Sequence, residues 1–322
     1  TLQTLPELGL GLPRYRLGDT AFYAGLESYA SRFWRDEGER GERLYLRPSL
    51  SAVFKPGSWL EVTPEVAFYE RLYSTDVTET DKFIPEVSLA LSSRLVKSFD
   101  VNLLGADRIQ HSIEPTVTYT YVPDEEQGGL PLFDLRDRVA SRNDVTYALV
   151  NRLTARSQAA DGSSLYRDLF YLRLSQRYDI DEVRNDRSGE KRPFSDLRVE
   201  MDFTPVNNFS FNAESIIPVY GDSGFNTLSA GSTLKDDSGN AVSASYTYKD
   251  ADFAGVATDY VEFQLDTSIL QPLYVRFKER YDFQENRALE DFVGFEYRSK
   301  CWSIILSYKT RYLEDEDNDH AV

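Results

Sequence analysis

The chain has 322 residues, of which 13% are aromatic, with one Met, one Cys and a formal net charge of -17. This acidic balance excludes the basic stripe that binds nucleic acid. No run of about 18 apolar residues is present that could form a transmembrane helix. A membrane barrel is not excluded, because its strands need only about 9–11 residues that alternate in polarity.

Segments in which apolar and polar residues alternate recur along the whole chain. In one of them, Leu197, Val199 and Met201 alternate with Arg198 and Glu200. This period of two is what a strand with one apolar and one polar face requires. The runs lie at 22–34, 44–54, 60–68, 86–95, 113–121, 145–153, 170–178 and 196–203, then around Phe211, Leu228, Tyr246, Phe263, Phe277 and Phe295, and last at 302–311. With a weak first run at 8–16, we predict about sixteen strands of an all-β antiparallel meander and no helix.

The stretch from 108 to 155 is the most informative. Its first run carries Val117, Tyr119 and Tyr121 on one face and threonines on the other. A polar loop from Pro123 to Arg142 contains the sequence Leu-Pro-Leu-Phe-Asp, and a second alternating run follows at 145–153. We predict two strands joined by a long, structured loop.

Strand length and loop length favour a membrane barrel over a soluble sandwich. Several runs reach ten or more residues, whereas globular strands usually have about five or six. Connections at 55–58, 204–208, 270–272 and 298–300 are short, and those at 123–142, 179–193 and 250–257 are long and charged. Short turns at one rim and long loops at the other are typical of outer-membrane barrels. The stretch at 97–107 departs from this pattern as a long connection on the rim of short turns.

Catalytic and metal-binding motifs are weak. The two histidines, His111 and His320, have no arrangement that indicates a triad. Acidic clusters lack the spacing of a calcium loop and are better interpreted as solvated charge. We therefore expect no catalytic residues, no metal site and no cofactor.

Charged residues on the polar faces of the later strands are more informative. A mixed, polar interior suits a water-filled or protein-plugged lumen. An exposed sheet face would have the same composition. The residues that we predict to face the lumen are Arg173, Arg177, Arg198, Glu200, Arg276 and Lys278.

Several stretches resemble the LptD family of outer-membrane proteins, which insert lipopolysaccharide. The central ones are IEPTVTYTYVP, LPLFD and NDVTYALVNRLTAR. The others are RLYLRPSLSAVFKPGSWLEVTPEVAFYERLY, KFIPEVSLALSSRLV and, near the end, FVGFEYRSKCWSIILSYKTRY. The last is similar to a family segment with adjacent cysteines, where this chain has Lys300-Cys301-Trp302. The resemblance implies a disulfide between Cys301 and a cysteine outside this chain.

The resemblance further implies a non-enzymatic translocon in the Gram-negative outer membrane that acts on lipopolysaccharide. Residues 1–322 would be a single barrel domain, a fragment without the family's N-terminal jellyroll, first barrel strands and closing strand. An LptE-like lipoprotein plug would fill the lumen, and an LptA-like periplasmic bridge would reach the protein through the absent N-terminal domain. In the loop that approaches the plug, the predicted partner-binding residues are Leu130, Pro131, Phe133 and Asp134. Phe133 would pack, and Asp134 would accept hydrogen bonds that fix the loop.

Two other classes remain open. A general diffusion porin or a receptor-type outer-membrane barrel would conduct ions without a plug. A soluble β-rich interaction protein would stay in the aqueous phase without detergent. The quoted motifs favour the lipopolysaccharide translocon over both.

Overall fold

The structure is a computed structural model that describes residues 2–103, 105–159, 161–185, 189–221, 224–312 and 319–321. These residues form nineteen β-strands, two short α-helices and one turn of 3₁₀-helix. Each recorded strand pair is antiparallel, and the strands follow one another as a meander. The predicted all-β antiparallel meander is confirmed. None of the helices in the described ranges has the length and hydropathy of a membrane span.

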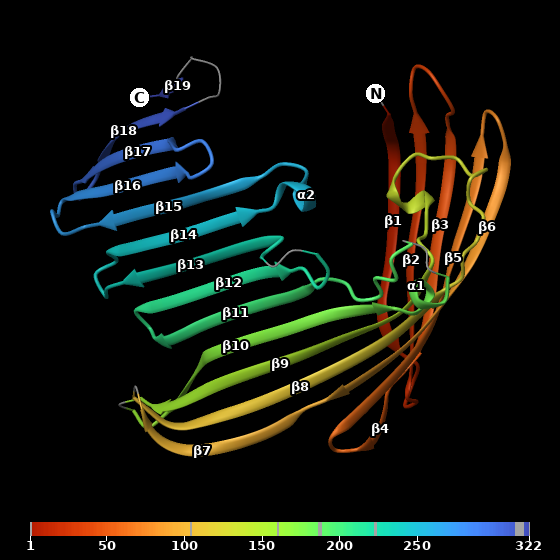
Figure 1. Cartoon of the computed structure of the whole chain (residues 1–322), viewed down its shortest axis with the longest axis horizontal. Helices are drawn as coiled ribbons and strands as arrows, with labels where there is room; N and C mark the ends of the chain where they lie inside the picture. The colour runs from red at the N-terminus through yellow and green to blue at the C-terminus, as the bar shows by residue number, and fades with distance from the viewer. Residues whose placement is uncertain are drawn as a thin grey trace. The chain divides into compact units, whose positions relative to one another are not determined.

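The chain divides into two compact units, and unit 1 contains residues 1–94, 114–148 and 177–195. Its strands pair in the order β1-β2-β3-β5-β6, with β4 beside β5 and the end of β8 beside β6 (Figure 1). The bounds are β1 (Gln3–Arg16), β2 (Phe22–Trp34), β3 (Gly41–Ala52), β4 (Phe54–Gly57), β5 (Leu60–Thr75), β6 (Glu79–Ser93) and β8 (Ala106–Val122). The unit also contains η1 (Leu135–Asp137), α1 (Ile180–Asn185), the start of β9 (Arg142–Gln158) and the end of β10 (Ser164–Asp179).

Unit 2 contains residues 95–113, 149–176 and 196–322. From β10 onward each strand pairs with the next one in the sequence, which Figure 1 shows as a ladder from β11 to β18. The bounds are β7 (Leu95–Leu103), β11 (Leu197–Val206), β12 (Phe209–Ile217), β13 (Thr227–Lys235), β14 (Ala241–Lys249), α2 (Ala251–Ala254), β15 (Thr258–Thr267), β16 (Leu273–Asp282), β17 (Arg287–Arg298), β18 (Ser303–Arg311) and β19 (Asp319–Ala321).

The strands of unit 1 have one polar and one apolar face. Arg43 of β3 stands opposite Ser31 of β2 and Tyr73 of β5, whereas its neighbour Leu44 stands opposite Leu72. The side chains of Leu44 and Leu72 are exposed, and so are those of Phe68, Phe83 and Val87 on the same face. A face of exposed large apolar side chains is unusual for a protein in water.

The strands of unit 2 show the same division. Leu265, Phe277, Val293 and Tyr308 occupy one rung across β15 to β18, and Glu262, Arg280, Glu290 and Arg311 occupy a rung on the opposite face. Ion pairs cover the second face, as between Arg280 and Glu262 at 2.6 Å. We call these the apolar face and the polar face of unit 2.

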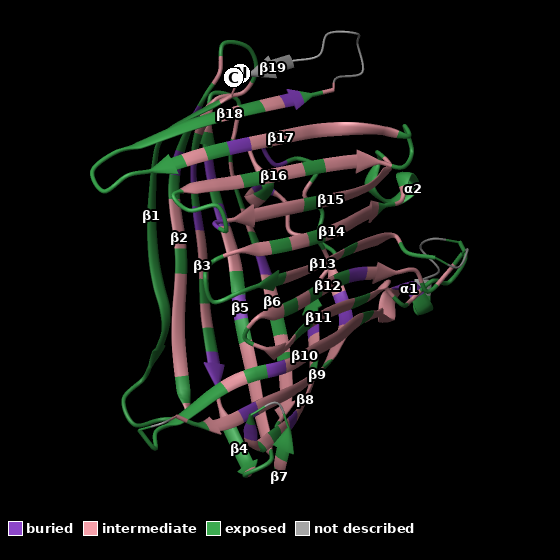
Figure 2. Cartoon of the chain, turned by 90° about the vertical axis from the view of Figure 1, so that its left-hand side faces the viewer, coloured by how far each residue is buried: buried purple, intermediate pink, exposed green. Residues whose placement is uncertain are grey.

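Buried side chains are few and lie in small clusters (Figure 2). In unit 1 the buried cluster comprises Phe33, Tyr73, Leu130 and Phe133. In unit 2 a second cluster comprises Ala106, Ala155 and Leu169. The edge strand β1 is exposed along its length. The cores are therefore local, and the largest one lies where a loop meets strands.

Three details differ from the sequence predictions. The described residues form nineteen strands instead of about sixteen, because β4, β7 and β19 were not predicted. The stretch at 97–107, predicted as a long connection, contains most of β7, which pairs with β8 as a hairpin. Two of the long connections, predicted without helix, contain α1 and α2.

Candidate functional site

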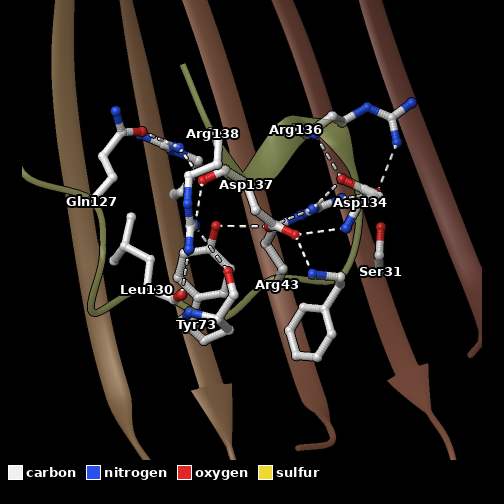
Figure 3. Close-up of polar contacts among 12 residues, drawn as sticks. Ser31, Arg43, Tyr73, Gln127, Leu130, Asp134, Arg136, Asp137 and Arg138 are labelled. Atoms are coloured by element: carbon white, nitrogen blue, oxygen red, sulfur yellow. Dashed lines mark hydrogen bonds and ion pairs between the residues drawn. The ribbon is translucent and has the colours of Figure 1, made fainter. Parts of the chain in front are cut away.

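The loop from Pro123 to Ser141, between β8 and β9, lies over the polar face of β2, β3 and β5 (Figure 3). We call it the strap. Its turn of helix, η1, begins with a capping box in which Asp134 accepts from the backbone N–H of Arg136. Such a box satisfies backbone donors at the start of a helix locally. The strap is thus a folded element with its own internal hydrogen bonds.

Asp137 is the central residue of the strap. Its side chain is fully buried. Oδ1 accepts hydrogen bonds from Arg43 Nη1 at 2.6 Å and from the Tyr73 hydroxyl at 2.8 Å. Oδ2 accepts from the backbone N–H of Phe133 at 2.6 Å and of Asp134 at 2.7 Å. One carboxylate therefore joins two strands of the sheet to two backbone amides of the strap.

Arg43 pairs with both carboxylates of the strap. Its Nη1 and Nη2 donate to the two oxygens of Asp134 at 2.6 and 2.8 Å, and Nη1 also donates to Asp137. The guanidinium carbon lies 4.9 Å from the centre of the Phe33 ring. A bidentate arginine–carboxylate pair fixes direction as well as distance. This contact sets where η1 lies on the sheet.

The two ends of the strap are tied together by Gln127. Its Oε1 accepts from the backbone N–H of Val139 at 3.0 Å, and its Nε2 donates to the carbonyl of Val139 at 2.9 Å. Arg71 Nη1 donates to Gln127 Oε1 at 3.1 Å and to the carbonyl of Asp137 at 2.7 Å. Arg138 Nη2 donates to the carbonyl of Leu130 at 2.9 Å. These bonds close the loop on itself above β5.

Aromatic packing completes the attachment. The rings of Phe133 and Phe33 are stacked, with centroids 4.3 Å apart and planes 8° from parallel. Leu130 and Tyr73 belong to the same buried cluster. The Arg136 guanidinium lies 3.9 Å from the centre of the Tyr29 ring. Contacts of this kind contribute about 0.5–1.5 kcal/mol beyond the burial of area.

The Asp134 carboxyl is electrostatically stabilised in its charged form. Burial raises its pKa, but the hydrogen bonds from Arg43 and from the backbone of Arg136 outweigh burial. The pKa is lowered from its ordinary value of 3.8. The pair with Arg43 is therefore charged at neutral pH.

The structure brings the four predicted strap residues together. Leu130, Pro131 and Phe133 are buried, and Asp134 is half-buried against Arg43. Their neighbours Leu132 and Leu135 point outward, with 61% and 96% of their surface exposed. Partner binding at this loop stays a prediction.

Sequence reasoning missed the residues on which the strap depends most. Asp137 stands three residues after Asp134, and an acidic pair at this spacing is a local sign of a capping box. Nothing in the sequence distinguishes Arg43, Arg71 and Tyr73 from other residues of the polar face. Their role follows from contacts with residues 56 to 94 positions away.

Five of the six residues predicted to face the lumen lie in ion pairs that the structure describes, and the sixth is Arg177. Within unit 2, Arg173 and Arg198 both pair with Glu200, at 3.1 and 2.8 Å. Lys278 lies 3.0 Å from Glu262, and Arg276 pairs with Asp266. In unit 1, the backbone N–H of Arg177 donates to Ser195 Oγ at 2.9 Å. That these charges face a lumen stays a prediction.

Cys301, in the turn between β17 and β18, is an exposed free thiol in this chain. The predicted disulfide with a cysteine outside the chain stays a prediction. Among the side chains that the structure describes, no group of three or more His, Cys, Asp or Glu could hold a metal ion.

Comparison with known proteins identifies the family. A family model described as "LptD: LPS transport system D" matches residues 1–259. The LPS-assembly protein LptD of Pseudomonas aeruginosa (strain UCBPP-PA14) is 24% identical over 336 residues, which cover 87% of this chain and 36% of that protein. LptD of Thiobacillus denitrificans is 21% identical, over 97% of this chain and 44% of its own length. LptD of Chromohalobacter salexigens is 27% identical, over 58% of this chain and 26% of its own length. The chain thus spans less than half of each of these relatives, and it belongs to the LptD family.

Proposed function

We propose that this chain is part of an outer-membrane β-barrel that inserts lipopolysaccharide into the outer leaflet and acts with a lipoprotein plug. The names of the relatives support lipopolysaccharide as the substrate. The observation that carries the proposal is the division of strands β15 to β18 into an exposed apolar face and an ion-paired polar face.

The apolar face suits lipid. Ile304 is 61% exposed, and Phe263, Phe295 and Leu306 on the same face are exposed as well. At roughly 25 cal/mol per Å² of apolar surface, such a face would be costly in water and stable in hydrocarbon. Strands β11 to β18 have 9 to 12 residues, and about 9–11 are needed to span a bilayer. These lengths support the outer membrane as the location.

The polar face suits an aqueous lumen. Its charges are paired along and across strands, as for Lys278 between Glu262 and Glu290. Paired charges of both signs are typical of barrel interiors. Lipopolysaccharide would reach the full-length protein through an LptA-like bridge, and its sugars would meet this face.

The strap is the proposed contact with an LptE-like plug. Because Leu130 and Phe133 are used within the chain, they would position the strap, and Leu132 and Leu135 would touch the partner. Replacement of Leu132 and Leu135 by Ser should reduce co-purification of a lipoprotein with the full-length protein in detergent. Val77→Ser is the matched control, since Val77 is an exposed apolar residue in the β5–β6 turn. Equal recovery of the lipoprotein in both variants would refute the contact.

Depletion of the full-length protein in its host tests the function itself. Newly made lipopolysaccharide should stop reaching the cell surface, as detected with a membrane-impermeant label. Normal surface labelling after depletion would overturn the proposal. A purified barrel that binds no lipoprotein and conducts ions by itself would indicate a porin instead.

A further inference from the structure

A pocket of about 610 Å³ opens on the polar face of unit 2, over β14 to β18. It is lined by charged and aromatic side chains, together with small residues of the pocket floor. Asp266, Tyr274, Arg276, Glu296 and Arg298 line it. None of these five residues belongs to the strap.

The pocket exists because the rung beneath it carries little side-chain volume. Gly294 stands opposite Arg276 on one side and Ser307 on the other. A Cβ at Gly294 would lie 3.0 Å from the ring of Phe292, which leans over the glycine. The floor is therefore a bare stretch of backbone with an aromatic ring beside it.

The two arginines that line the pocket are oriented by neighbouring carboxylates. Arg298 donates from Nε and Nη2 to the two oxygens of Glu296, each at 2.8 Å, and its guanidinium lies 3.9 Å from the centre of the Tyr274 ring. Arg276 donates from Nε to Asp266, and 62% of its side chain is exposed. In the part of the chain that the structure describes, no hydrogen bond occupies the Nη atoms of Arg276. Arg276 thus presents Nη donors to the pocket, and beside it the Arg298 guanidinium is fixed by Glu296 and Tyr274.

This set of groups matches one ligand class. Guanidinium donors in a fixed orientation recognise phosphate or carboxylate oxygens. Carboxylates accept hydrogen bonds from sugar hydroxyls, and serine hydroxyls both donate to and accept from them. The Phe292 ring offers an apolar surface to the C–H face of a sugar. We propose that this pocket binds an anionic saccharide, with Arg276 and Arg298 contacting its phosphate or carboxylate group. The assignment rests on the proposed function, in which the polar face meets the sugars of lipopolysaccharide.

The position of the pocket along the strands supports this role. It is bordered by Ser238 and Gly239 of the β13–β14 turn and by Ser268 of the β15–β16 turn. These turns and the β17–β18 turn lie at the same end of the strands (Figure 1). They are short, as periplasmic turns of barrels are. With the short turns on the periplasmic side, the pocket would lie at the end of the polar face where a saccharide enters from the periplasm.

Binding to the full-length protein in detergent tests the site. The probe is the phosphorylated core oligosaccharide released from lipopolysaccharide by mild acid, measured by calorimetry. Loss of two charge-assisted contacts in the Arg276→Gln, Arg298→Gln double variant should weaken binding by at least about tenfold. The control is Arg198→Gln, which removes an ion-paired arginine of the same face outside the pocket. It should change binding by less than about twofold, as expected of an exposed pair.

A second variant tests the pocket independently, in case the double arginine variant misfolds. Ser307→Tyr fills the pocket, keeps both arginines and places a good strand former in β18. It should weaken binding as well. Equal affinity in wild type and in either variant, or no binding by the wild type, overturns the site. Equal binding of inorganic phosphate alone, or of an uncharged oligosaccharide of similar size, overturns an anionic-saccharide site.

The outcome is separable from the proposed function. If depletion abolishes surface lipopolysaccharide but the double variant of Arg276 and Arg298 binds the oligosaccharide as tightly as the wild type, the proposed function stands and the proposed site is wrong. If depletion leaves lipopolysaccharide at the surface, the proposed function is wrong whatever the pocket binds.

Discussion

Asp137→Asn should release the strap from the sheet without unfolding the strands. The carboxylate accepts four hydrogen bonds, from Arg43, from Tyr73 and from two backbone amides. The amide keeps one acceptor oxygen and turns a donor toward groups that also donate. Two hydrogen bonds to a charged group are lost, at about 1.5 kcal/mol each or more, or about 3 kcal/mol together. The roughly 3–5 kcal/mol for breaking a buried ion pair is an upper bound, because Arg43 keeps Asp134.

Hydrogen exchange of the peptide that contains the strap measures this opening. A cost of about 3 kcal/mol raises the open population roughly hundredfold, since each 1.4 kcal/mol is a factor of ten. Exchange of the Phe133 and Asp134 amides should accelerate accordingly in the full-length protein in detergent. Glu125→Gln is the control, because it removes the same charge from the same loop but belongs to an exposed pair with Lys82. Exchange in the Asp137 variant no faster than in this control would refute the reasoning.

Three further predictions follow from the contacts. Phe133→Ala removes a buried stacked ring, so the same exchange assay should show a strap opening that is easier by about 3 kcal/mol. Because the pKa of Asp134 is lowered, its contribution to the attachment is fully present above 3.8 and is lost as the pH falls through the lowered value. Cleavage of the strap by pepsin, measured relative to an unfolded substrate at each pH, should therefore increase only as the pH falls below 3.8, and relative cleavage that is already maximal above 3.8 would contradict this. In a Cys301→Ser background, Lys278→Cys should react with a charged, water-soluble thiol reagent faster than Phe277→Cys, and equal rates would refute the assignment of the two faces.

The strands were predictable because their pattern is local. Side chains of consecutive strand residues point to opposite faces, so a period of two reports a two-faced strand wherever it occurs. Val87 and Leu89 on one face and Ser88 on the other are an example, and their pairing with β8 confirms the prediction. β7 was missed because Val96 and Lys97 interrupt its alternation, and its register is set by β8. Helices as short as α2, with four residues, have no periodicity to detect.

The strap was predictable only in part. Its length and polar character predicted a structured loop, and the resemblance of its Leu-Pro-Leu-Phe-Asp sequence to the LptD family singled out residues that lie where the strap meets the sheet. The partners Arg43 and Tyr73 could not be predicted, because they lie 94 and 64 residues from Asp137 in the sequence. They contact Asp137 only through the register of the strands and the placement of the loop. Sequence patterns assign faces to strands but do not show which loop lies over which face.

The polar attachment of the strap follows from the apolar face on the other side of the same strands. A loop can be held to a sheet by apolar packing alone, which avoids the cost of burying charges. The leucines of these strands cannot hold the strap, because Leu44 and Leu72 lie on the face opposite Arg43 and Tyr73. A shift of the strand register by one residue would exchange the two faces completely. If the apolar face lies in lipid, as proposed, a loop over the other face has to be held by residues of that face, here Arg43, Tyr73 and Phe33. We infer that the buried network around Asp137 follows from the placement of Leu44 and Leu72 on the opposite face of the same strands. Replacing Arg43 and Asp137 together by Leu should therefore cost less stability than replacing Asp137 alone by Leu.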